Sequence, residues 1–414
     1  MAGIIAETTL PSPSVVQSTD KITRITGGTQ VGGNLFHSLR EFSVSFNGTI
    51  LEVVPSVTNV FLRVTGLEVS TIEGQIALRQ PDGSISPANF FLINANEVIF
   101  GSRASFLLNG SLITTTAASI YFEDGFQFGP STPEVAELTD SSPVALQFEN
   151  NPRKIINLAF QQVQDDGKPV LDALGDPIYG LNGAAGQTLA LVGGDIVIAA
   201  ETPEVPGGRL TAVAGRIEVG SVVSADWVSL TPTKTGWVLG YEKVQQFGTI
   251  QLADGAVINS SGGGAVQVQG REVALTDLAQ IYSTAGEGQL GETLQVIASA
   301  SITVSGGFSS IRTETEGPNP AGHVEISAER VAILDGGRIG SVTLAQGSGG
   351  DVRVKANSVT VSGTAIIEGQ RFSSLLYVLS LSTGAPGKLI IETTTPPDVS
   401  EGGEIITGEN FQNF

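Results

Sequence analysis

The sequence contains no cysteine, which excludes a disulfide framework and any cysteine-bound metal. A cytosolic enzyme of 414 residues would usually carry a few thiols. Their absence fits a chain that crosses an oxidising compartment and must not cross-link on the way. The two histidines, His37 and His323, are far apart in the sequence, so we expect no metal site.

Charged and aromatic residues are also scarce, at 15% and 6% of the chain. The longest apolar stretch, residues 189–200, is too short to span a membrane and contains Asp195. The net charge of −20 disfavours binding to nucleic acid or to an anionic membrane surface. The sequence therefore predicts a scattered acidic surface and no nucleic-acid partner.

Helical periodicity is nearly missing, and short alternating strands take its place. Residues 266–269 (VQVQ), 324–327 (VEIS) and 352–355 (VRVK) each place apolar side chains on one face and polar side chains on the other. Glycine, serine, asparagine or aspartate follows such strands, as expected where a chain turns sharply. The pattern is typical of half-buried β-strands joined by tight corners.

These strands belong to a repeat: a glycine, any residue, a four-residue alternating strand, a short polar link and a second apolar alternation. The first apolar residues of successive copies are spaced by 28, 30, 28 and 37 residues; they are Val266, Leu294, Val324, Val352 and Leu389. A fixed period with short strands indicates a solenoid, since one unit cannot bury its apolar face alone. We predict an all-β fold, a single right-handed parallel β-helix.

Two segments break the coil pattern and predict hairpins that leave the solenoid. The first is 154–182, where Asp166-Gly167 is a strong hairpin turn signal. The second is an insertion near 372–381. Within the coils, Asn94-Ala95-Asn96-Glu97 stands between two apolar runs, and a corner between buried strands explains it.

The main alternative function is a β-helical polysaccharide lyase or hydrolase. Such enzymes need carboxylates that converge on one exposed face. The densest acidic stretch, 165–176, coincides with the predicted hairpin turn, so we assign no catalytic residue. The segment 286–291 (GEGQLG) matches a dinucleotide-binding pattern but precedes a strand rather than a helix, so we expect a loop and no cofactor.

The N-terminal part resembles a known family. Residues 25–38 (ITGGTQVGGNLFHS), followed by Glu41-Phe42, are similar to the start of the filamentous-haemagglutinin-like secretion domain of two-partner secretion exoproteins, most of all its cyanobacterial branch. Residues 91–101 (FLINANEVIFG) resemble the family's Asn-Pro-Asn-Gly motif, with Ala95 in place of proline and Glu97 in place of glycine. The most specific motifs fall within 20–135, and 186–196 and 228–233 also resemble the family.

The resemblance implies a domain organisation and a mode of export. Residues 4–250 would form the secretion domain and residues 251–414 β-helical adhesin-type repeats. The chain would pass unfolded through the periplasm to a dedicated outer-membrane transporter, whose periplasmic domains recognise it, and would fold at the cell surface. It would be an adhesin rather than an enzyme, secreted or surface-exposed, with a cell-surface glycan or protein as its ligand.

The resemblance also implies recognition residues for the transporter. They are Asn34, Leu35, Phe36, His37, Ser38, Asn94 and Asn96. Replacement of the family's proline and glycine weakens the preset turn at 94–97. Family members begin near Ile-Ile-Pro-Asp-x-Thr-Leu, and here 4–10 (IIAETTL) follow only three residues. We therefore expect that the signal peptide is absent from this chain.

Overall fold

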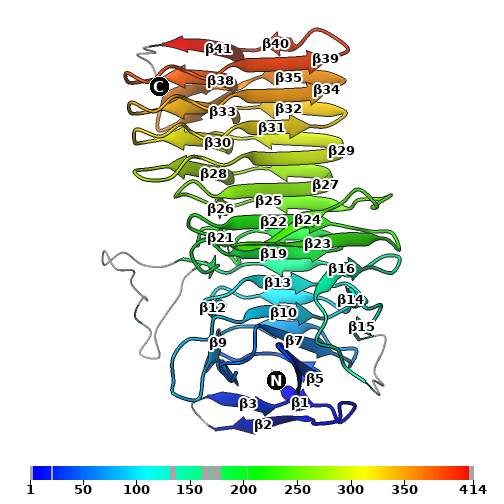
Figure 1. Ribbon diagram of the computed structural model, residues 1–414. Helices are drawn as coiled ribbons and strands as arrows, with labels where there is room; N and C mark the ends of the chain where they lie inside the picture. Colours follow the sequence, from blue (N-terminus) through cyan, green and yellow to red (C-terminus); the bar gives the residue numbers. More distant parts are fainter. Residues whose placement is uncertain are drawn as a thin grey trace. The chain divides into compact units, whose positions relative to one another are not determined.

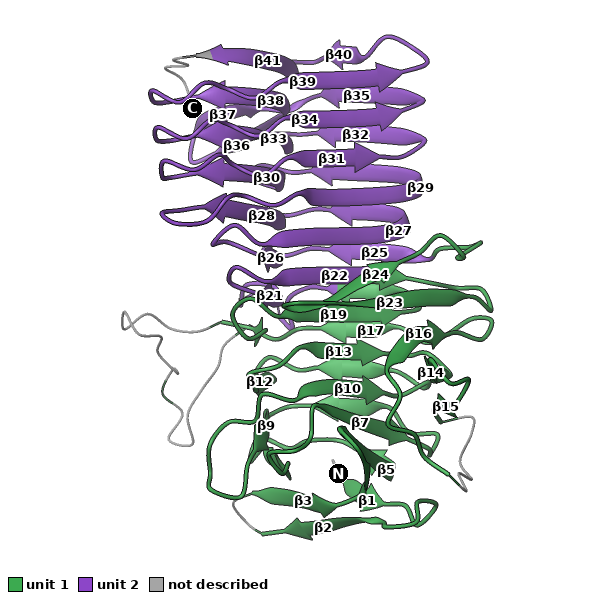
Figure 2. Cartoon of the chain, viewed as in Figure 1, with its two compact units in different colours: residues 1–197, 220–247 green, residues 198–219, 248–414 purple. Residues whose placement is uncertain are grey.

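The structure is a computed structural model that describes residues 3–19, 22–130, 137–160, 168, 179–202 and 204–409. Its regular elements in these residues are all β-strands, and most pair in parallel, which confirms the predicted all-β, β-helical fold (Figure 1). No helix among the described residues is long and apolar enough to cross a membrane. The chain forms two compact units, unit 1 with residues 1–197 and 220–247, and unit 2 with residues 198–219 and 248–414 (Figure 2).

Unit 1 is a stack of coils whose strands pair in parallel on three faces. One face contains β5 (Asn34–Phe42), β7 (Asn59–Val64), β10 (Asn89–Ile93), β13 (Leu112–Thr115) and β19 (Thr188–Gly193). The second contains β8 (Ser70–Ile72), β11 (Val98–Phe100) and β17 (Ile155–Asn157). The third contains β3 (Thr23–Gly27), β6 (Thr49–Glu52), β9 (Gln75–Arg79) and β12 (Ser105–Leu107), and β18 (Leu181–Asn182) contacts β12.

Antiparallel strands complete the N-terminal end of unit 1. The strand β1 (Ile4–Ala6) pairs with β5, β2 (Ser14–Ser18) pairs with β3, and β4 (Thr29–Val31) forms a hairpin with β5. Because these strands run against the coil direction, they end the parallel stack and cover its first apolar layer. We call β1, β2 and β4 the N-terminal cap.

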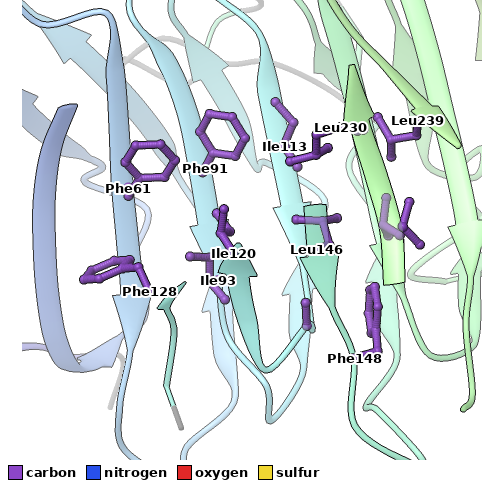
Figure 3. Packing of buried hydrophobic residues seen from close by; sticks show 14 of the residues in the cluster. Phe61, Phe91, Ile93, Ile113, Ile120, Phe128, Leu146, Phe148, Leu230 and Leu239 are labelled. Atoms are coloured by element: carbon purple, nitrogen blue, oxygen red, sulfur yellow. The ribbon is translucent and has the colours of Figure 1, made fainter. Parts of the chain in front are cut away.

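A five-stranded antiparallel sheet lies outside the coils of unit 1. Its strands are β15 (Gln127–Phe128), β14 (Ser119–Phe122), β16 (Pro143–Gln147), β23 (Trp227–Thr233) and β24 (Gly236–Gly240). We call it the covering sheet. Its apolar side chains, among them Ile120, Leu146 and Leu230, form one buried cluster with Phe61 and Phe91 of the coils (Figure 3).

Unit 2 repeats a more regular coil. One column contains β27 (Ala265–Leu275), β29 (Leu294–Ser305), β31 (Val324–Ser327), β34 (Val352–Ala356) and β39 (Leu389–Thr393). A second contains β25 (Thr249–Leu252), β32 (Arg330–Leu334), β35 (Ser358–Ser362) and β40 (Asp398–Ser400), with the later halves of β27 and β29. A third contains β21 (Arg209–Thr211), β26 (Val257–Asn259), β28 (Gln280–Ala285), β30 (Ser310–Thr315), β33 (Arg338–Thr343), β38 (Leu375–Ser380) and β41 (Glu404–Glu409). The chain passes between the units three times: within β20 (Ile196–Ile198), within β22 (Arg216–Ser221) and between Phe247 and Gly248.

The register of unit 2 confirms the repeat. The five first apolar residues pair with one another in order; the pairs are Val266 with Leu294, Leu294 with Val324, Val324 with Val352 and Val352 with Leu389. In β34 the side chains alternate, with Val352 and Val354 buried and Arg353 and Lys355 exposed. The segment 286–291 connects β28 to β29 and lies in a loop, as predicted.

The two predicted hairpins need correction in position. The hairpin near 372–381 lies instead at 364–373, where β36 (Thr364–Ile367) pairs antiparallel with β37 (Gln370–Ser373), and β38 belongs to the coil stack. Its turn is Glu368-Gly369, both with positive φ (49° and 80°), as a two-residue hairpin turn requires. The range 154–182 was too wide, because β17 pairs in parallel with β11 inside the stack. The Asp166-Gly167 turn lies outside the described residues.

Candidate functional site

The predicted recognition residues 34–38 begin β5, and all five are buried. Strand alternation divides them between two faces. Leu35 and His37 are in register with Val60 and Leu62 of the next coil and belong to the coil interior. Asn34, Phe36 and Ser38 belong to the outward face, where Phe36 joins the cluster beneath the covering sheet. Both faces of this stretch are therefore buried, although three of its five residues are polar.

Asn34 begins a ladder of asparagines along the coil axis. The Nδ2 of Asn59 donates to the Oδ1 of Asn34 (3.0 Å), and the Nδ2 of Asn89 donates to the Oδ1 of Asn59 (2.9 Å). The Nδ2 of Asn34 also donates to the carbonyl oxygens of Thr139 (3.1 Å) and Ser141 (2.9 Å). The ladder therefore ties the first three coils together and fixes the segment that leads into β16.

His37 is the one ionisable side chain that β5 directs into the coil interior. Its Nδ1 lies 2.9 Å from the Oγ of Ser14, in the N-terminal cap, whereas its buried Nε2 has no hydrogen-bond partner among the described residues. Burial lowers the pKa of His37 to about 4, because the charged imidazolium would lose its hydration. Gly28 is required beside it, since a Cβ there would lie 2.9 Å from the imidazole ring and 2.7 Å from a β5 carbonyl.

Ser38 contacts a buried arginine that the sequence did not suggest. The Nε of Arg63 donates to the Oγ of Ser38 (3.0 Å), and its Nη1 donates to the carbonyl of Gly129 (3.2 Å). Its Nη2 donates to the Oγ1 of Thr9 (3.2 Å), and its guanidinium lies 4.5 Å from the centre of the Phe128 ring. Burial lowers the pKa of Arg63 to about 10, against the opposing effect of the Glu7 carboxylate. A single arginine thus joins the first coils, the N-terminal segment and the covering sheet. In the sequence, the only indication of this role is that Arg63 is a lone charged residue in an apolar strand.

Asn94 and Asn96 form the corner between β10 and β11, as predicted. The buried Asn94 accepts a hydrogen bond at Oδ1 from the Asn96 backbone N–H (2.9 Å) and donates to Ser70 Oγ (2.9 Å) and the Glu68 carbonyl (3.1 Å). The Nδ2 of Asn96 donates to the Gly66 carbonyl (2.7 Å). Glu97 ends the corner with a positive φ of 144°, at the position where the family motif has glycine.

The structure divides the predicted site between two ends of the strands. Asn34 is in register with Asn59 and Asn89, where the strands begin, whereas Ser38 is in register with Arg63 and Ile93, immediately before Asn94. Among the seven residues only Asn96 is partly exposed. The folded chain therefore presents no common surface made of these side chains.

Two kinds of site considered from the sequence were a metal centre and a carboxylate cluster. In the described part of the chain, the His, Asp and Glu residues include no group of three or more that could hold a metal ion. The acidic stretch 165–176 that we considered for catalysis lies outside the described residues, apart from Lys168.

The fold defines the class first: a parallel β-helix with an antiparallel N-terminal cap and an outer covering sheet. The chain belongs to the TPS secretion domain family, whose model matches residues 2–271. These are the secretion domains of two-partner secretion exoproteins, and the secretion domains themselves are not enzymes.

Two solved structures are similar to the chain. One is the HMW1 secretion domain from Haemophilus influenzae, with 13% identity and a TM-score of 0.41, covering 96% of this chain and 100% of that one. The other is the filamentous hemagglutinin secretion domain, with 12% identity and a TM-score of 0.31, covering 98% and 99%. No curated protein matches the sequence.

Proposed function

We propose that this protein is an adhesin-like exoprotein that a dedicated outer-membrane transporter carries to the cell surface or the medium. The family match over residues 2–271 carries the proposal. In it, residues 4–250 form the secretion domain that the periplasmic domains of the transporter recognise, and residues 251–414 form adhesin-type repeats. The motif at 32–38 supports assignment to the cyanobacterial branch of the family.

Burial of the recognition residues favours a mechanism in which the transporter recognises the chain before the chain folds. Six of the seven residues are buried, so a transporter could contact their side chains only in an unfolded or partly folded chain. Folding would then withdraw the same side chains into the asparagine ladder and the 94–97 corner. Withdrawal would release the chain from the transporter, since a buried side chain cannot keep a partner outside the fold.

A secretion experiment with matched variants tests this proposal. The full chain, preceded by a signal peptide, is co-expressed with its transporter, and protein in the medium is measured. Asn94→Ala with Asn96→Ala should reduce secretion roughly tenfold or more, as expected when residues that dominate a recognition event are truncated. Asn34→Ala should reduce it in the same direction.

Ser70→Ala is the matched control, because it removes the folded-state partner of Asn94 and leaves the motif intact. We expect it to be secreted at the wild-type level. Normal secretion of the double variant would contradict the recognition role. An equal loss in Ser70→Ala would assign the asparagines to folding alone.

A further inference from the structure

A groove of about 380 Å³ lies on the outward face of unit 2, at the start of its strands. Its polar lining comes from Arg216, Glu292, Thr293, Gln295 and Glu325. The volume is in the range of small-ligand sites. No aromatic residue is among the lining residues, so recognition there must depend on hydrogen bonds.

Neighbouring side chains hold the lining in place. The Nε2 of Gln295 donates to Glu325 Oε2 (3.1 Å), and the Nη2 of Arg216 donates to Gln267 Oε1 (3.3 Å). Arg216 also forms an ion pair with the buried Glu218. Gln267, Gln295 and Glu325 are in register on successive strands, so their side chains follow one another at the spacing of neighbouring strands, roughly 4.8 Å.

Glu292 departs from the repeat, and the packing of the coils does not require a glutamate at this position. The position two residues before the first apolar residue is glycine in the four other copies, at Gly264, Gly322, Gly350 and Gly387. Close backbone contact explains all four glycines, since a Cβ on any of them would lie within 2.3 Å of a carbonyl oxygen of the preceding coil, and at 1.8 Å for Gly322 and Gly350. At Glu292 the chain instead carries an exposed carboxylate beside the groove.

We propose that this groove binds a segment of a neutral oligosaccharide, a role that deepens the adhesin part of the proposed function and rests on it. Carboxylate and amide oxygens accept hydrogen bonds from sugar hydroxyls, and amide and guanidinium N–H groups donate to them. The carboxylates of Glu292 and Glu325, on a chain of net charge −20, disfavour an acidic saccharide. Side chains already held by one another lose little freedom on binding.

Calorimetric titration of the full chain tests the proposal. The probes are cellohexaose, maltohexaose and mannohexaose, with hexagalacturonate as the acidic counterpart. We expect at least one neutral probe to bind saturably and the acidic probe to bind at least tenfold more weakly. Glu292→Gly should weaken neutral binding about tenfold while it restores the glycine of the other coils, so the fold should be kept. Gln295→Ala should have the same effect, and Lys355→Ala, exposed and outside the groove lining, should leave the affinity within about twofold.

Four results would overturn the inference: no binding of any neutral probe, preference for the acidic probe, unchanged affinity in Glu292→Gly and Gln295→Ala, or release of reducing ends that Glu325→Gln abolishes. The last result would indicate hydrolysis instead of binding. Secretion of Gln295→Ala should equal that of the wild type. Failure of the wild type to leave the cell would count against the proposed function, whereas normal secretion without saccharide binding would count against this inference alone.

Discussion

The outward faces of the two units differ although both units are stacks of β-coils. In unit 1 every residue from Phe90 to Ile93 in β10 is buried, whereas in unit 2 β34 alternates between buried valines and exposed Arg353 and Lys355. The covering sheet accounts for the difference, because it lies on the outward face of β5 to β19. Coil geometry alone therefore does not decide whether an outward position is aromatic or charged. The presence of a covering sheet over that position decides it.

The covered face begins with an aromatic stack on β5, β7 and β10. Ring centres are 5.2 Å apart for Phe36 and Phe61 and 4.7 Å apart for Phe61 and Phe91, and Trp237 of the covering sheet lies 5.8 Å from Phe91. Unit 2 carries Gln267, Gln295, Glu325 and Arg353 in register on its outward face. The outward face of unit 1 is therefore buried beneath its own covering sheet, whereas that of unit 2 carries polar side chains that are partly or fully exposed.

The largest expected effect is a carboxylate introduced into the interior of unit 2. Val354→Asp should lower the free energy of unfolding by more than about 4 kcal/mol, because an unpaired charge would be buried. Lys355→Asp, the next residue and exposed, should change it by less than about 0.5 kcal/mol. Urea unfolding followed by far-UV circular dichroism measures both. Equal midpoints would contradict the register of β34.

The second-largest expected effect tests whether the covering sheet stabilises unit 1. Phe91→Ala should cost about 3–5 kcal/mol, because it opens a cavity between β10 and the covering sheet. The outward Gln295→Ala in unit 2 should cost less than about 0.5 kcal/mol. Tryptophan fluorescence reports unit 1 alone, since both tryptophans, Trp227 and Trp237, lie there. A small effect of Phe91→Ala on that signal would show that the covering sheet does not stabilise unit 1.

The third expected effect is a pH dependence of the free energy of unfolding that arises from His37, in unit 1. Above pH 6.5 His37 is neutral in the folded and unfolded chain and contributes nothing. Between 6.5 and its folded pKa of about 4 only the unfolded chain takes up the proton, so the free energy of unfolding falls by about 3 kcal/mol and then levels off.

Paired unfolding curves at pH 7 and pH 4.5 isolate this contribution. The variant His37→Asn should lose the His37 component of the decrease, whereas His323→Asn, at an exposed histidine of unit 2, should retain it. The same pH dependence in wild type and His37→Asn would show that carboxylates, not His37, cause the acid sensitivity.

The smallest effect compares two corner asparagines. Asn94→Ala should cost about 2 kcal/mol, because it leaves the Asn96 backbone N–H and the Ser70 hydroxyl without their buried partner. Asn357→Ala, at the exposed corner between β34 and β35, should cost less than about 0.5 kcal/mol. Thermal unfolding of the two variants checks the difference, and equal melting temperatures would mean that burial of the unit 1 corner adds no stability.

The period-two alternation of the strands made much of the coil structure predictable from the sequence. The alternation in 352–355 and the spacing of Val266, Leu294, Val324, Val352 and Leu389 follow from local backbone geometry, so the coil, its register and its inward residues were predictable. The corner at Asn94 was predictable for the same reason, since turn residues act within a few positions.

The tertiary structure alone decided what covers the coils. Pairing of β16 with β23 joins residues about 80 positions apart, and the hydrogen bonds from Asn34 to Thr139 and Ser141 span more than 100 positions. A period-two pattern contains no information about such distant partners, so β10 was recognisable as a buried strand but the covering sheet was not. Arg63 shows the same limit: its sequence neighbours are apolar, and only packing brings Thr9, Ser38 and Gly129 around its guanidinium, where they compensate for its loss of hydration.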